Sequence, residues 1–238
     1  MRPFYLWIVM ILLLPASLVH AEEDHKALLQ DCQVQYSANS PLAIAVCKKL
    51  AEKDVPAAQK IMGDMYFWGF TSIPRNYEQA AYWYKKAAVN DDVEAQYNSG
   101  VMYEQGKGMP VDYARAFKWF LSAAKKGYAP AQFNVANMFS KGAGVAQDQQ
   151  EAFHWYQKAA EQGDVAAMFN TGNRYAIGNG TGRDFAKAYM WYHIAAEQGV
   201  GVAERSKQIL AQQMSEEDMA RAEAFIRGWR PNPAIIRK

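Results

Sequence analysis

Apolar residues recur along most of the chain with the spacing of an α-helix. Around the first tryptophan of the central region, small or aromatic residues stand at Ala80, Trp83, Tyr84 and Ala87. Intervals of three, four and seven residues place side chains on one face of a helix, whereas a half-buried strand would show an interval of two. We therefore predict an all-α protein. Four tryptophans are expected in the core of its helices: Trp83, Trp119, Trp155 and Trp191.

The helical pattern repeats with a period of 36 residues. The four tryptophans are each 36 residues apart, and so are the alanine pairs that follow them. Upstream of each tryptophan stands a second matched series, which consists of an alanine, a glycine or alanine, and an aromatic residue. Gly-x-Gly segments at 106–108, 142–144 and 178–180 separate the two series, and the first unit carries one extra residue near Thr71. The pattern of each unit therefore predicts two helices that form a hairpin, joined by a glycine loop.

The ends of the second helix in each unit carry typical capping residues. An aspartate that can accept a hydrogen bond from a free backbone amide stands before this helix in three units: Asp112, Asp148 and Asp184. A glycine stands after it: Gly127, Gly163 and Gly199. Small residues between the two helices let their axes approach closely, and the tryptophan is expected to fill the space between successive hairpins.

This unit resembles the Sel1-like repeat, a relative of the tetratricopeptide repeat with a longer loop. The similarity rests on the alanine, glycine and aromatic series, the Gly-x-Gly loops, and the ending Lys-Ala-Ala-Glu-Gln-Gly at 158–163. The sequence departs from the family pattern at Ala136, which replaces the helix glycine, and at 89–91. The resemblance implies a right-handed superhelical α-solenoid of stacked helix-turn-helix repeats. We expect four repeats, at residues 53–92, 93–128, 129–164 and 165–200.

The flanking segments are expected to cap the solenoid, because a terminal repeat has no neighbour to cover its apolar face. Residues 22–52 predict a helical hairpin, and residues 201–238 predict further helices and a tail. Cys32 and Cys47, the two cysteines of the chain, lie about two helical turns on either side of the bend of this hairpin. We predict that they form a disulfide. A catalytic or metal-binding role is the alternative, although no CxxC motif or His/Asp cluster accompanies them.

Residues 1–21 have the pattern of a cleaved signal peptide. Arg2 precedes an apolar run from Phe4 to Val19, and Ala21 stands before a charged segment. The run contains Pro15 and is short for a membrane span, which favours cleavage over retention as an anchor. We expect an exported protein, in the periplasm or secreted, where an oxidising environment favours the disulfide.

Composition and charge narrow the range of partners. Half of the residues are hydrophobic, and 26 basic against 24 acidic residues give a formal net charge of +2. Such a chain can bury a sizeable core, and its charge is too small to favour nucleic acid as the main partner.

The residues with catalytic potential form no recognisable site in the sequence. His154 and His193 flank repeat tryptophans at positions that vary between units, as expected for a helix surface. Ser122 and Lys125 fit the SxxK pattern of penicillin-recognising enzymes, but both occupy variable positions, and the companion motifs SDN and KTG are missing. We expect no enzymatic activity, no cofactor and no metal.

The first helices of such stacked hairpins line a concave groove that can hold an extended peptide or a partner helix. The resemblance to the tetratricopeptide pattern places groove residues three and two positions before the helix glycine and one after it. Nine residues occupy these positions in units two to four: Tyr97, Asn98, Val101, Phe133, Asn134, Asn137, Phe169, Asn170 and Asn173. A row of amides can pair with the backbone of a bound peptide. The alternative is that the amides bond neighbouring repeats and the rings belong to the core.

Together these features favour an exported, non-enzymatic scaffold that binds a protein or peptide partner in its groove. An envelope enzyme or cell-wall-binding protein that acts on peptidoglycan or β-lactams is the alternative function. An enzyme would need a fixed polar constellation that breaks the repeat symmetry, and the sequence shows none. A secreted factor that acts on a host cell fits the same sequence features as the scaffold.

Overall fold

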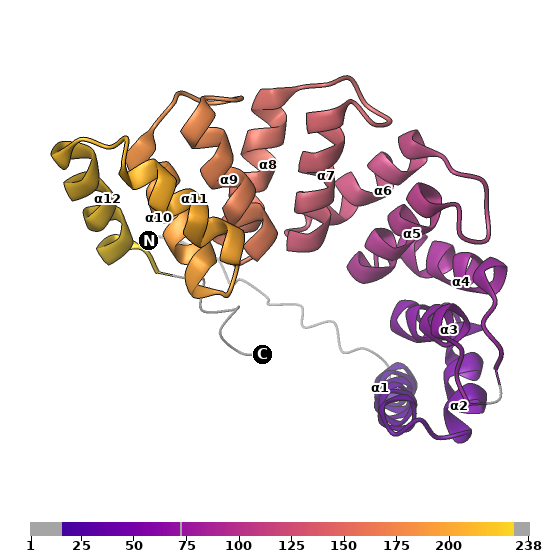
Figure 1. The fold of residues 1–238 in the computed structure, drawn as a ribbon. Coiled ribbons are helices and arrows are strands. Elements are labelled where there is room, and N and C mark those ends of the chain that lie inside the picture. The colour runs from indigo at the N-terminus through magenta and orange to yellow at the C-terminus, as the bar shows by residue number, and fades with distance from the viewer. Residues whose placement is uncertain (1–15, 72, 231–238) are drawn as a thin grey trace, which may run out of the picture.

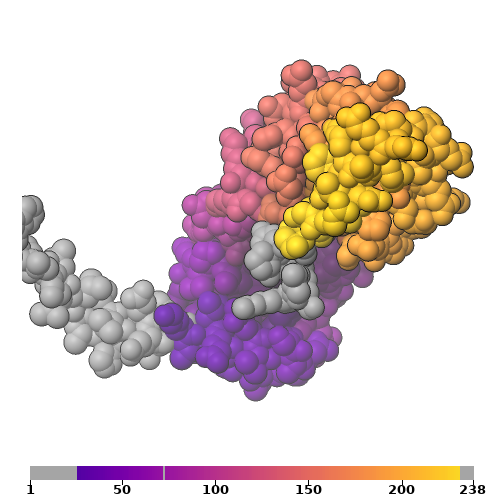
Figure 2. All heavy atoms as spheres, turned by 90° about the vertical axis from the view of Figure 1, so that its left-hand side faces the viewer, coloured from indigo at the N-terminus to yellow at the C-terminus, as the bar shows by residue number. Residues whose placement is uncertain are grey.

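The computed structural model describes residues 16–71 and 73–230, with side chains from Lys26 onward. These ranges form twelve α-helices and, apart from one bridge between Phe70 and Ile73, no strand pairing. Each helix from α1 to α10 packs against the next, α12 packs against α10, and together the helices follow an arc (Figure 1). The N-terminal and C-terminal helices occupy opposite ends of the molecule (Figure 2). The prediction of an all-α solenoid is confirmed.

The four repeats contain helices α3 to α10, each of thirteen residues. Their bounds are α3 (Pro56–Trp68), α4 (Tyr77–Val89), α5 (Val93–Gln105), α6 (Tyr113–Lys125), α7 (Ala129–Lys141), α8 (Gln149–Glu161), α9 (Val165–Ile177) and α10 (Phe185–Glu197). The N-terminal hairpin consists of α1 (Ala16–Ser37) and α2 (Leu42–Ala51), and the C-terminal part consists of α11 (Gly201–Ala211) and α12 (Glu216–Gly228). None of the helices in the described part of the chain is long and apolar enough to span a membrane.

The predicted caps of the second helices are present. The side chains of the three capping aspartates accept hydrogen bonds from backbone amides of the first turn, and Asn76 does the same for α4. The glycines that follow α6, α8 and α10 have φ values of 89°, 91° and 88°. Asp91 occupies the equivalent position after α4 with φ of 69°, so this left-handed conformation is kept without glycine.

The N-terminal hairpin contains the predicted disulfide between Cys32 and Cys47, with their Cα atoms 5.0 Å apart and both residues fully buried. Helix α1 begins at Ala16, earlier than the start near residue 23 that the charged segment indicated, because no helix-breaking residue stands between Ala16 and Ser37. Residues 1–15, which hold most of the predicted signal peptide, lie outside the described residues.

Three of the four repeat tryptophans are buried as predicted, but Trp119 is only half-buried. Trp83 and Trp155 are covered by the lysine that follows three residues later, since Lys86 and Lys158 lie over their rings at 5.7 and 4.9 Å. Ser122 occupies this position after Trp119 and is too short to cover the indole. Trp119 therefore lies at the edge of the core, although it still packs against two of the apolar clusters.

The ring that follows each tryptophan is buried in all four repeats. Tyr84, Phe120, Tyr156 and Tyr192 are all at least 95% buried. In three repeats this ring lies against the helix glycine so closely that a Cβ on Gly63, Gly100 or Gly172 would overlap it. Close approach of the two helices therefore explains the small residue at this position.

A ladder of three buried glutamines connects successive hairpins: Gln59, Gln96 and Gln132. The Nε2 atom of each donates a hydrogen bond, of 3.1, 3.2 and 3.1 Å, to a carbonyl at the end of the preceding second helix. The Oε1 atom of Gln132 accepts a hydrogen bond of 2.6 Å from Gln162 of the same repeat. These polar contacts satisfy helix-end carbonyls inside the stack.

The middle step of this ladder is incomplete. The Oε1 atom of Gln96 is buried and has no hydrogen-bond partner among the described residues. Lys126 stands where Gln162 stands in the next repeat, but its ammonium group turns to the carbonyl and carboxylate of Asp91, at 3.0 and 2.7 Å. The donor that would complete the step is thereby used elsewhere.

The apolar core is continuous through the later repeats and divided near the start of the solenoid. One large cluster extends from Tyr103 to Leu210, and a separate cluster joins the disulfide to Trp83. Between them lie two small clusters, one around Met102 and one around Ala88.

Candidate functional site

The nine predicted groove residues all lie on the first helices α5, α7 and α9, and all are half-buried. Contacts between successive first helices show that these helices share one surface. Lys60 of α3 forms an ion pair of 2.8 Å with Glu94 of α5, and the ring of Tyr97 lies 5.3 Å from that of Tyr128, which precedes α7. This surface is the candidate site.

The three aromatic residues of the predicted groove are partly used inside their own repeats. The rings of Tyr97, Phe133 and Phe169 lie 5.5, 5.8 and 5.7 Å from the buried ring that follows the tryptophan of the same repeat. Distances of this size are typical of tilted and edge-to-face aromatic pairs. Each groove ring is therefore anchored to the core on one side and half-exposed on the other.

The groove residue that follows the helix glycine accepts a hydrogen bond from inside its own repeat in most of the repeats. The hydroxyl groups of Tyr156 and Tyr192 donate hydrogen bonds of 2.5 and 2.7 Å to Oδ1 of Asn137 and Asn173. Tyr84 makes the equivalent bond of 2.8 Å to Asp64 in the first repeat. In the second repeat Val101 takes this position, opposite a phenylalanine that has no hydroxyl group. In three of the four repeats this bond joins the two helices of one hairpin, within the repeat rather than between repeats.

The amides of the second row, Asn98, Asn134 and Asn170, make few hydrogen bonds within the protein. The Nδ2 atom of Asn170 donates to the carbonyl of Ala166 in its own helix, at 2.8 Å. Burial raises the pKa of Tyr97, and the amide of Asn134, close to its hydroxyl group, opposes part of this rise. The amides therefore lie at the surface with hydrogen-bonding capacity left over, because each amide has more donor and acceptor sites than these contacts use.

A charged cluster at the start of the same surface was not predicted as a unit. Lys60 lies between Asp64 of its own helix, at 3.2 Å, and Glu94 of the next repeat. Burial alone would lower the pKa of Lys60, but the two carboxylates outweigh it and the net shift is upward. Burial raises the pKa of Asp64, while Lys60 and the hydroxyl of Tyr84 oppose the rise. The surface thus changes from charged groups at repeat one to amides at repeats three and four.

The residues with catalytic potential are not brought together. His154 is exposed beside Trp155, and His193 lies 3.4 Å from Glu197 on the same helix. Ser122 is half-buried, whereas Lys125 is exposed. Within residues 16–71 and 73–230 there is no group of three or more His, Cys, Asp or Glu side chains that could hold a metal ion. These arrangements offer no nucleophile with an adjacent base.

Comparison with protein-family models matches the Sel1 repeat to residues 56–92, 93–128, 129–164 and 165–200, which is more than half of the chain. The chain belongs to the Sel1 repeat family. Sel1 repeat proteins are in general protein-interaction scaffolds, and their fold is typically non-enzymatic. The surface formed by the first helices of these Sel1 repeats is accordingly described as a candidate protein-binding surface.

Two solved structures support the assignment to the Sel1 repeat family. A protective antigen of uropathogenic Escherichia coli with an SLR fold is similar with a TM-score of 0.75 and 30% identity, over 87% of this chain and 46% of the antigen. A Sel1 repeat protein from Oxalobacter formigenes is similar with a TM-score of 0.71 and 32% identity, over 75% of this chain and 73% of that protein. The chain therefore spans less than half the length of the E. coli antigen. No protein of curated function matches the chain.

Proposed function

We propose that the protein is an exported, non-enzymatic scaffold that binds an extended protein or peptide segment along the first helices of its Sel1 repeats. The observation that carries the proposal is the row of Asn98, Asn134 and Asn170, which places one half-buried amide at the same position of three successive repeats. A bound backbone presents donors and acceptors at regular intervals, and such a row can pair with it without reading its sequence.

The chemistry of the neighbouring groups suits a polypeptide. The anchored rings of Tyr97, Phe133 and Phe169 supply apolar contact beside the amides, and the cluster around Lys60 and Glu94 supplies charge at one end of the row. The interface core of protein complexes is enriched in aromatic residues and depleted of charge, as in the middle of this row.

Export is proposed on the signal-peptide pattern of residues 1–21 together with the Cys32–Cys47 disulfide, which is typical of an oxidising compartment. Cell fractionation followed by N-terminal sequencing tests this part of the proposal. We expect the chain in the periplasmic or extracellular fraction with Glu22 as its first residue, and an intact N-terminus on a cytoplasmic chain would contradict it.

The binding surface is tested by the double variant Asn134→Ala and Asn170→Ala, used as bait for envelope extracts and read by mass spectrometry. The matched control is Lys118→Ala with His154→Ala, two exposed residues that share one position on the second helices. We expect partners retained by the wild-type and control chains to be lost from the asparagine variant, while the melting temperature stays near that of wild type. Unchanged capture by a destabilised asparagine variant would show instead that the amides only bond the repeats.

A further inference from the structure

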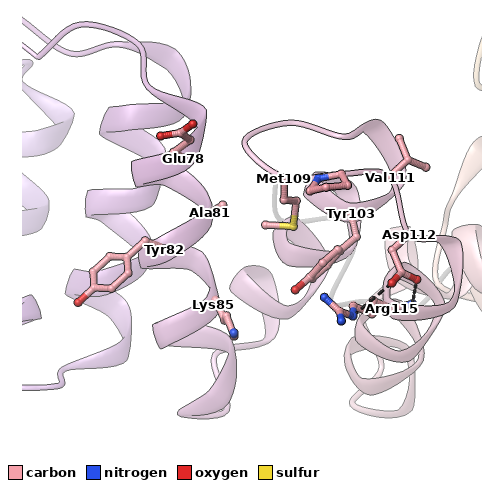
Figure 3. Close-up of a pocket in the computed structure, with 10 residues that line it drawn as sticks. Glu78, Ala81, Tyr82, Lys85, Tyr103, Met109, Val111, Asp112 and Arg115 are labelled. Carbon is pink, nitrogen blue, oxygen red and sulfur yellow. Dashed lines mark hydrogen bonds and ion pairs between the residues drawn. The ribbon is translucent and has the colours of Figure 1, made fainter.

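A cleft with a volume of about 490 Å³ opens between the second helices of the first two repeats, away from the asparagine row. Its lining includes Ala81 of α4, Tyr103 of α5, and Met109 and Val111 of the intervening loop (Figure 3). In the same view Arg115 lies beside the hydroxyl end of Tyr103, and Lys85 lies on the α4 side of the cleft.

The cleft exists because one aromatic side chain is missing. The positions equivalent to Ala81 in the following repeats carry Phe117, Phe153 and Tyr189. The ring of Phe117 meets Phe139 of the next repeat edge-to-face at 5.1 Å, and that of Phe153 meets Tyr175 at 5.0 Å. Phe139 and Tyr175 are the equivalents of Tyr103. Of the rings of Tyr103, Phe139 and Tyr175, only that of Tyr103 has an alanine in place of the covering ring.

The charges around the cleft favour an acidic group at one end. Lys86 is paired with Asp54 at 3.5 Å, whereas no carboxylate among the described residues lies within ion-pair distance of Lys85. Arg115 uses its Nε atom to pair with Asp112 at 3.2 Å, and its guanidinium group lies 5.7 Å from the centre of the Tyr103 ring. Glu78 stands at the opposite end of the cleft, where it would repel a second carboxylate.

We propose that this cleft binds an aromatic side chain of a protein partner, with a carboxylate next to that ring directed toward Lys85 and Arg115. The incoming ring takes the place that Phe117 and Phe153 take in the later repeats and contacts Tyr103 edge-to-face. The later junctions supply the geometry for this occupant, because the same fold already holds a ring there. The site is separate from the asparagine row, since none of the three asparagines lines the cleft.

The simplest probe is N-acetyl-L-phenylalanine, which carries one phenyl ring and one carboxylate. Titration into the full isotope-labelled chain, followed by amide chemical shifts, is expected to move the signals of residues 81–85 and 103 with a dissociation constant of about 1 mM, as for a small fragment. N-acetyl-L-phenylalanine amide, which lacks the charge, is expected to bind several-fold more weakly, and N-acetyl-L-alanine is expected not to bind.

Two variants decide the proposal. Ala81→Phe places the chain's own ring over Tyr103 and is expected to abolish binding while circular dichroism shows an unchanged helix content. Lys85→Ala is expected to weaken binding of the acid about tenfold and to leave binding of the amide unchanged. The proposal is overturned if Ala81→Phe binds the probe like wild type, or if the shifts map to the asparagine row. Concentration-dependent shifts of residues 81–85 without a probe would overturn it in favour of a second copy of the chain.

Discussion

The incomplete glutamine ladder allows a quantitative prediction about the stability of the solenoid. The perturbation is the replacement of Gln96 or Gln132 by methionine. Methionine already occupies the equivalent position of the fourth repeat, where Met168 is 2% exposed, so the fold accommodates this side chain without a cavity. The two substitutions are chemically identical and differ mainly in the state of the glutamine Oε1 atom, although Gln96 Nε2 also donates a long hydrogen bond of 3.4 Å to Asp91.

The magnitudes follow from the hydrogen bonds that each substitution removes. Gln132→Met loses the bonds to the carbonyl of Ala124 and from Gln162, each with a net worth of about 1 kcal/mol, so unfolding should require about 1–2 kcal/mol less free energy. Gln96→Met also loses donor bonds, but it removes a buried acceptor whose unmet desolvation costs about 1–3 kcal/mol. Its net effect should be near zero or stabilising.

Thermal unfolding followed by far-ultraviolet circular dichroism measures the difference. For a chain of this size, about 1 kcal/mol corresponds to a change of about 2–4 °C in melting temperature, so Gln132→Met should melt several degrees below Gln96→Met. The reasoning is refuted if Gln96→Met lowers the melting temperature as much as Gln132→Met does.

A third variant tests the cause assigned to the missing bond. Lys126→Gln places an amide at the position of Gln162 in the next repeat, and we expect it to donate to the Gln96 Oε1 atom as Gln162 donates to Gln132. We expect a gain of about 1 kcal/mol, because a surface ion pair such as the one lost from Lys126 contributes little. The gain should disappear when Gln96→Met is also present, and a gain that persists in the double variant would show that it has another origin.

Two further predictions concern the loops and the tyrosines. A Cβ on Gly180 would overlap the carbonyl oxygen of Gln149, whereas a Cβ on Gly199 meets nothing, although φ is positive at both. Gly199→Ala should lower the free energy of unfolding, measured by urea titration, by about 1 kcal/mol, and Gly180→Ala should lower it clearly more. Equal losses would argue against the close approach of Gly180 to Gln149. Burial raises the pKa of seven tyrosines, among them Tyr84 and Tyr192. Above the ordinary pKa of 10 the unfolded chain loses these protons first, so stability should fall with rising pH, by up to about 1.4 kcal/mol per pH unit for each such tyrosine. Tyrosinate absorbance should therefore rise together with loss of helix, and Tyr192→Phe should make the fall less steep; ionisation with the helices intact would contradict this prediction.

The helices and their ends could be predicted from the sequence because they depend on local chemistry. Periodicity places side chains on one face of a helix, and the aspartates before the second helices could be recognised as caps from their position alone. The pairing of Cys32 with Cys47 also followed, because a short hairpin leaves two cysteines at matched heights little choice of partner.

The details of the candidate surface depend on distances between side chains of neighbouring repeats. The 36-residue period of the sequence does not specify these distances. The exposure of Trp119 depends on whether residue 122 is long enough to cover it. The internal role of Asn137 and Asn173 had a signal in the sequence, since an oxygen acceptor accompanies tyrosine in three repeats and Val101 accompanies phenylalanine in the other. The cleft at Ala81 likewise becomes evident only when it is known which ring each aromatic residue covers.

Three irregularities meet at the junction between the first and second repeats. The unpaired oxygen of Gln96, the half-exposed ring of Trp119 and the cleft at Ala81 all lie there, and the apolar core is divided at the same place. Because each repeat of a solenoid is coupled only to its neighbours, a division of the apolar core can separate two cooperative blocks. We therefore expect hydrogen exchange to show the disulfide-bonded N-terminal block and the later repeats opening as separate units.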